Sequence, residues 1–73
     1  MNGAMLDLVG VCSMLRLSCE AAGGQQAWAE RHGISASYVS DVLNGRRDPG
    51  ESILRALGLA KVTRYVIQRR VNG

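Results

Sequence analysis

The stretch that most constrains this chain is residues 25–44, QQAWAERHGISASYVSDVLN, which has a glycine near its centre. The pattern predicts a helix of about eight residues, a tight turn at Gly33, and a second helix that has Ser35 as its N-cap. Ile34 follows the turn and should fill the angle between the two helices. Two short helices joined in this way are held at a fixed angle, with the second one aimed outward. This shape fits the major groove of DNA.

The second helix of this unit has two faces of different character. Val39, Val42 and Leu43 recur at helical spacing, so they should face the core. The opposite face carries short polar or small side chains in place of the Lys and Glu of an ordinary solvated helix. Its residues are Ala36, Ser37, Ser40 and Asp41, with Tyr38 at the flank. Because short side chains let a helix backbone come close to base edges, this face is the predicted contact surface.

A longer amphipathic helix is predicted ahead of this unit, from Met5 to the Gly23-Gly24 pair that would end it. Its predicted buried face consists of Met5, Leu8, Cys12, Leu15, Cys19 and Ala22. A second apolar set on the same helix consists of Leu6, Val9, Met14, Leu17 and Ala21. One buried face does not need both sets. The surplus indicates either a helix wrapped on most sides or a contact surface, for a second copy or for the C-terminal segment.

The sequence after the unit predicts a loop, a fourth helix and a segment of different character. The loop is GRRDPG, and the helix starts near Glu51 or Ser52 and ends at Gly58. Its apolar stripe is Ile53, Leu54 and Leu57. Residues 61–70, KVTRYVIQRR, favour a strand because they are rich in β-branched and aromatic side chains, while a fifth helix also fits their spacing. A lone strand needs a partner, and a symmetric copy of itself is the obvious one.

We therefore expect residues 1–73 to form a single all-α domain of four short helices, plus a C-terminal strand or fifth helix used for dimerisation. The predicted dimerisation residues are Val62, Arg64, Tyr65, Val66 and Ile67. Apolar residues make up 47% of the chain, which is enough for a folded core. A domain of this size is only marginally stable alone, so dimerisation would help it.

Charge is distributed unevenly along the chain. Residues 1–45 contain two arginines against four acidic residues, a net charge of −2. Residues 46–73 contain seven basic residues against Asp48 and Glu51, a net charge of +5. The basic half is either a surface that faces phosphates or a solvated tail, and charge alone does not separate the two.

Several classes of function are not expected. Cys12 and Cys19 lie about 10 Å apart along one predicted helix, too far for a disulfide, and should be buried free thiols of a reducing cytoplasm. His32 is the only histidine, and no metal-ligand or nucleophile spacing accompanies it, so we expect no enzyme, cofactor or metal. No signal peptide is visible, and the apolar run from Met5 to Leu17 is too short to span a bilayer. We therefore expect a soluble, cytoplasmic protein without membrane contact.

Residues 25–44 resemble the helix-turn-helix of the lambda-repressor and Cro-like family of DNA-binding proteins. The matching positions are Trp28, Ala29, Gly33, Ile34, Val39 and Val42. Trp28 takes the first buried position of the first helix, and Ala29 is the small residue where the two helices touch. The resemblance continues through YVSDVLNGRRDPG and ILRALGL, so that it covers residues 24–59, about half of the chain.

The resemblance implies phosphate contacts at matching positions and in the loop behind them. The predicted phosphate-contacting residues are Gln25, Gln26, Tyr38, Asn44, Arg46 and Arg47, of which Gln25, Asn44 and the two loop arginines follow from the resemblance. Gln25 begins the first helix of the unit, and Gln26 belongs to the same turn. Asn44 ends the second helix, and the two arginines lie in a loop that often follows the DNA backbone. Tyr38 either donates to a phosphate or is half-buried packing.

The base-reading positions of the family fall on Ala36, Ser37, Ser40 and Asp41. The two serine hydroxyls can donate or accept hydrogen bonds. Ala36 stands where such proteins often have a glutamine or arginine, and it offers only a methyl contact to thymine. Asp41 accepts from a cytosine amino group or, as we slightly prefer, forms a salt bridge with one of the loop arginines.

These residues together lead us to expect a sequence-specific regulator that binds double-stranded DNA. It would be a small repressor of phage or prophage type that binds an inverted repeat as a homodimer in a bacterial cell, without a small-molecule effector. The alternative is a protein-interaction module on the same fold, such as an antitoxin or a phage adaptor, with weak or no specific DNA binding.

Overall fold

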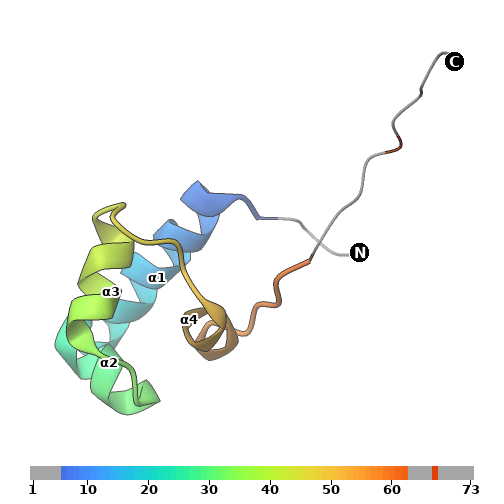
Figure 1. Ribbon diagram of the computed structural model, residues 1–73. Helices are drawn as coiled ribbons and strands as arrows, with labels where there is room; N and C mark the ends of the chain where they lie inside the picture. The colour runs from blue at the N-terminus through green and yellow to red at the C-terminus, as the bar shows by residue number, and fades with distance from the viewer. Residues whose placement is uncertain (1–5, 63–66, 68–73) are drawn as a thin grey trace, which may run out of the picture.

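The computed structural model describes residues 6–62 and residue 67, and this part of the chain contains four α helices and no strand (Figure 1). The helices are α1 (Leu8–Ala22), α2 (Gln25–His32), α3 (Ala36–Leu43) and α4 (Glu51–Ala56). The expected all-α fold is therefore confirmed for the described residues. The question of strand or fifth helix over residues 61–70 lies mainly outside them. Val62 and Ile67, which are described, belong to neither kind of element.

Helix α1 begins later than the sequence predicted. Asp7 is its N-cap, and the Asp7 carboxylate accepts a hydrogen bond of 2.9 Å from the Gly10 N–H. A capping acid satisfies a backbone N–H that the helix itself leaves unpaired, so the helix starts just after it. Leu6 consequently precedes the helix, and Met5 lies outside the described residues.

The buried face of α1 also differs from the predicted one. Val11, Leu15 and Cys19 are buried, although neither predicted apolar set contained Val11. Leu8 is 52% exposed, because the first turn of the helix lies beyond the core. The surplus set is largely uncovered within the described residues, since Val9 is 73% and Leu17 is 65% exposed.

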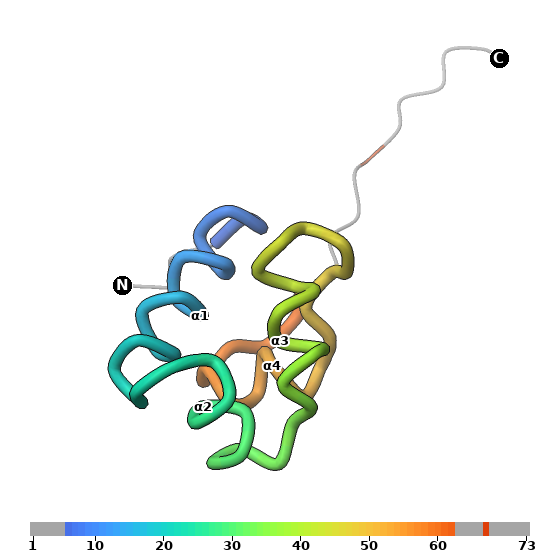
Figure 2. Tube along the Cα trace, turned by 90° about the vertical axis from the view of Figure 1, so that its left-hand side faces the viewer, coloured from blue at the N-terminus to red at the C-terminus, as the bar shows by residue number. Residues whose placement is uncertain are grey.

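The core is a cluster in which all four helices take part. Helix α1 packs against both α2 and α3 (Figure 1, Figure 2). Helix α4 adds one buried side chain, that of Ile53, to the cluster. The buried residues of the cluster are Leu15, Cys19, Trp28, Ala29, Val39, Val42 and Ile53. Trp28 is thus a core residue, as its position indicated. Burial raises the pKa of the Cys19 thiol above its ordinary value, so this side chain stays protonated and packs as a small apolar group.

The turn between α2 and α3 follows the prediction closely. Gly33 has φ +67°, a left-handed conformation that suits glycine. The Ile34 N–H then donates to the Ala29 carbonyl at 2.8 Å, and the Ile34 side chain packs against the core. Ser35 is the N-cap of α3, and its hydroxyl accepts from the Tyr38 N–H at 3.2 Å. Because both ends of this turn are hydrogen-bonded, the direction of α3 relative to α2 is well determined.

Helix α4 is short and is attached to the core through Ile53, which is fully buried. The helix ends at Ala56, the chain then turns at Gly58, and the Leu59 N–H donates back to the Leu54 carbonyl at 2.8 Å. Leu57, the C-cap residue of the helix, packs against the core. The residues that follow leave the helix along the end of the molecule where α1 begins.

Leu15 and Leu17 provide a test of which face of α1 is buried. Leu15→Ala should lower the free energy of unfolding by about 2–5 kcal/mol, because it leaves a cavity in the core. Leu17→Ala, on the exposed face of the same helix, should change it by less than about 0.5 kcal/mol. Urea denaturation at one protein concentration measures both. Equal losses in the two variants would contradict the observed orientation of the helix.

Candidate nucleic-acid interface

The outer face of α3 is the surface that the sequence singled out, and its residues differ in exposure. Ser37 is exposed, whereas Ser40 and Asp41 are half-buried. Ala36 is also half-buried and packs against the core, so only part of its methyl surface faces outward. Val39 and Val42 on the opposite side are fully buried. The orientation of the helix is therefore fixed by its valines, and its serines and Asp41 are directed outward.

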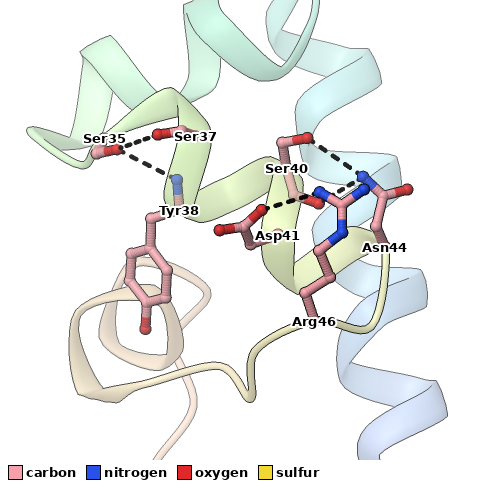
Figure 3. A network of polar contacts seen from close by, with 7 residues as sticks. All are labelled: Ser35, Ser37, Tyr38, Ser40, Asp41, Asn44 and Arg46. Atoms are coloured by element: carbon pink, nitrogen blue, oxygen red, sulfur yellow. Dashed lines mark hydrogen bonds and ion pairs between the residues drawn. The ribbon is translucent and has the colours of Figure 1, made fainter.

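At the start of α3, the hydroxyl groups of Ser35 and Ser37 lie 3.3 Å apart (Figure 3). The Ser35 oxygen already accepts from the Tyr38 N–H. A hydroxyl group has one donor hydrogen and two lone pairs, so Ser37 retains hydrogen-bonding capacity toward an incoming group. Ser37 is thus the most accessible polar side chain of this face.

Asp41 forms an ion pair with Arg46, as the sequence indicated (Figure 3). The Arg46 guanidinium donates to the Asp41 carboxylate at 3.3 Å, with the side chains 69% and 33% exposed respectively. An ion pair this exposed contributes at most about 1 kcal/mol. The Arg46 side chain can therefore leave the pair for a stronger anionic partner at small cost.

Asn44 follows the last residue of α3 and folds back onto it (Figure 3). Its side-chain amide donates to the Ser40 carbonyl at 2.9 Å and lies 3.3 Å from the Ser40 hydroxyl. The amide donors expected to reach a phosphate are thus used to close the end of the helix. In this conformer the groups left outward are the amide oxygen of Asn44 and the exposed Arg46 beside it.

Tyr38 connects α3 to the loop ahead of α4. Its hydroxyl oxygen accepts a hydrogen bond of 2.6 Å from the Gly50 N–H, and its ring packs against the core. The Arg47 guanidinium lies over the ring, 4.5 Å from its centroid, a cation–π contact. The half-buried packing that the sequence left open for Tyr38 is what the structure shows, whereas its contacts with Gly50 and Arg47 were not predicted. An aromatic residue on the flank of a helix, followed by a Pro-Gly pair before the next helix, was the available signal.

The first turn of α2 is the other predicted phosphate contact. Gln25 and Gln26 are exposed, and Gly24, the N-cap, supplies no side-chain hydrogen bond to the helix. Backbone N–H groups at such a helix start point outward and carry partial positive charge. These glutamines form no hydrogen bond with the polar residues of α3. The two groups are related only through the packing of α2 on α3.

The predicted site residues therefore fall into separate groups. Ser40, Asp41, Asn44 and Arg46 form one contiguous cluster at the C-terminal end of α3. Tyr38 and Arg47 form a second cluster with Gly50. Of the predicted dimerisation residues, Val62 and Ile67 are 62% and 93% exposed. Arg64, Tyr65 and Val66 lie outside the described residues.

Two other kinds of site concern the same part of the chain. Among the described residues, no three His, Cys, Asp or Glu side chains are grouped closely enough to hold a metal ion. Within that range, no helix has the length and apolar character needed to cross a membrane. In comparisons with known proteins, the chain matched no protein-family model, no curated protein and no solved structure.

The contact between Tyr38 and Gly50 can be tested by a double-mutant cycle. A Cβ added at Gly50 would lie 2.5 Å from the Tyr38 hydroxyl oxygen but 3.7 Å from the ring carbon that carries it. Gly50→Ala should therefore lower the free energy of unfolding by about 1–3 kcal/mol. In a Tyr38→Phe background, which itself costs about 1 kcal/mol, the added loss should be at least about 1 kcal/mol smaller.

Gly50 is also the N-cap of α4, where glycine is preferred over alanine. That preference acts equally in both backgrounds and cancels in the cycle. Urea denaturation of the four proteins gives the coupling, and the same cost for Gly50→Ala in both backgrounds would contradict the contact.

Proposed function

We propose that this protein is a sequence-specific regulator that binds double-stranded DNA, with α2 and α3 as a helix-turn-helix and α3 in the major groove. The observation that carries the proposal is the outward face of α3. It is small, polar and fixed in orientation by two fully buried valines, and two exposed arginines follow directly behind it. This combination meets the steric and electrostatic needs of a groove-reading helix.

Affinity and specificity would come from different residues. Arg46, Arg47 and the first turn of α2 supply the sequence-independent contacts with phosphates. Arg46 is held near α3 by a weak ion pair that phosphate can replace, and Arg47 is held by the Tyr38 ring. Base reading falls to Ser37, Ser40 and Asp41, with a partial methyl contact from Ala36. None of these four is a bidentate arginine or glutamine, so one domain reads few bases.

A homodimer would overcome this limit. Two copies related by a two-fold axis place their α3 helices in successive major grooves, about 34 Å apart, and double the number of bases read. Exposed Val62 and Ile67 in residues 61–70 supply apolar surface for such a contact. Covering its site on DNA is enough for such a dimer to block transcription. We therefore propose a small repressor of phage or prophage type that recognises an inverted repeat.

One observation favours a second candidate, a protein-interaction module on the same fold. Leu8, Val9 and Leu17 expose apolar surface along α1. The ion pair between Asp41 and Arg46 also leaves the outer face of α3 with little net charge. A module of this kind would bind DNA weakly and without regard to sequence, or would not bind it at all.

Selection of bound sequences from random duplexes separates the two candidates. The regulator should enrich an inverted repeat whose half-site centres lie about one helical turn apart, and the site should persist over competitor DNA. Enrichment of no sequence would remove the regulator and leave the interaction module. Enrichment of a site without two-fold symmetry would remove the dimeric mode of binding.

The loop arginines can be tested by their effect on the salt dependence of binding. Arg46→Ala combined with Arg47→Ala should weaken binding to all duplexes by a similar factor. It should also flatten the salt slope by about one for each phosphate that the loop no longer neutralises. Fluorescence anisotropy at several salt concentrations measures both quantities.

The matched control is Arg16→Ala combined with Arg31→Ala. It removes the same charge from two exposed positions outside the proposed surface. The control should leave the salt slope close to that of the unchanged protein, and denaturation curves should show that both double variants are folded. If the two double variants behave alike, the loop does not contact phosphates.

A further inference from the structure

A groove of about 470 Å³ lies beside the start of α1. It is formed by the start of α1, the loop ahead of α4 and the chain that follows α4. Its apolar lining is Leu6, Leu8, Val11, Pro49, Leu54, Leu59 and Val62. Three of these side chains, those of Leu6, Leu8 and Val62, are between 44% and 62% exposed. The groove is thus an apolar surface that the described residues do not fill.

The sequence that follows Val62 contains further apolar residues. Val62 lines the groove, and Ile67, five positions later, is 93% exposed. Valine and isoleucine at such exposure contribute nothing to the stability of an isolated copy. Each would contribute roughly the full value of its burial if it were covered by another surface. Val62, Ile67 and the groove are therefore all apolar surfaces that the described residues leave uncovered.

The segment is poorly suited to fill the groove of its own copy. Ile67, the one residue of 63–70 that the structure describes, is 93% exposed and does not line the groove of its own copy. Residues 61–70, KVTRYVIQRR, contain no Gly, Pro, Asn, Asp or Ser, the residues that form tight turns. Eight extended residues, 63–70, reach at most about 29 Å. That reach is enough to arrive at a neighbouring molecule.

Charge also favours this pairing. Asp7 and Asp48 line the groove, together with Lys61 at the point where the chain leaves it. The sequence beyond Val62 carries Arg64, Arg69 and Arg70 and no acidic residue. A basic apolar segment and an apolar groove with two carboxylates are complementary in both respects.

We propose that residues 63–70 of a second copy of this chain occupy the groove between the start of α1 and the chain after α4. The exchange is reciprocal, so a dimer contains two such docking sites related by a two-fold axis. This inference rests on the homodimer of the proposed function and names the surface that receives the C-terminal segment. It differs from a dimer in which the two segments pair with each other, because there the groove plays no part.

Three variants of the full chain test the proposal by sedimentation in the absence of DNA. Leu8→Asp alters the groove, and Ile67→Asp alters the segment. Leu17→Asp is the matched control, because Leu17 is exposed on α1 but does not line the groove. Each of the first two changes acts at both docking sites, so each should raise the dimer Kd by about 100-fold or more. The control should leave the Kd unchanged.

Mixing the two weakened variants gives the decisive result. A pair made of one Leu8→Asp copy and one Ile67→Asp copy retains one intact groove facing one intact segment. The mixture should therefore form a heterodimer that neither variant forms alone. Its formation also shows that both variants are folded, and an acidic residue in the first turn of a helix is favourable in any case.

Several results would overturn the proposal. They are an unchanged protein that stays monomeric at micromolar concentration, a Leu8→Asp variant that still dimerises, a Leu17→Asp variant that dissociates, and a mixture that remains monomeric. Retained dimerisation of Leu8→Asp would assign the interface to segment–segment pairing. The DNA assay is independent of all of these. If the protein forms the dimer but selects no DNA site, the proposed regulator is wrong and the docking of the segment stands. If a monomer selects a DNA site, the docking is wrong and DNA binding stands.

Discussion

The rest of the structure depends on the burial of the inner face of α3. Val39 and Val42 are fully covered, and they meet Leu15 from α1 and Ile53 from α4 in one cluster. A helix of eight residues has little stability of its own, so this burial is what keeps it helical. The same burial fixes its rotation. Because two valines face inward, Ser37 and Asp41 face outward. The packing of the core therefore determines which residues form the candidate interface.

A second set of contacts extends this order to the loop behind α3. The hydrogen bond from the Gly50 N–H to the Tyr38 hydroxyl joins the loop to the helix, and the same ring supports Arg47. Arg46 is held from the other side by Asp41. Arg47 is thus oriented before any ligand arrives, which would lower the entropy lost on binding an anion, whereas Arg46 would first have to leave its weak ion pair. A flexible loop with the same two charges would bind phosphate more weakly.

The sequence was enough to predict the turn between α2 and α3, because that turn depends on interactions between neighbouring residues. Gly33 and Ser35 were predicted because a left-handed turn and an N-cap each depend on a few neighbouring atoms. The start of α1 was missed because Asp7 caps the helix more effectively than an apolar residue extends it. Val11 was missed because only the position of the other helices shows which part of a broad apolar stripe is covered. The contact of Tyr38 with Gly50, twelve residues apart, is likewise tertiary.

The ion pair between Asp41 and Arg46 would affect both the affinity of this surface for DNA and its discrimination between base sequences. If Arg46 moved to a phosphate, Asp41 would be left half-buried near the DNA backbone, a cost that every sequence shares. A cytosine amino group opposite Asp41 would offset that cost at one base pair only. The carboxylate then acts mainly by penalising the wrong sequences, and binding by one copy stays weak. In the proposed dimer such a surface would be used twice, so the interface between copies would be as important as α3 itself.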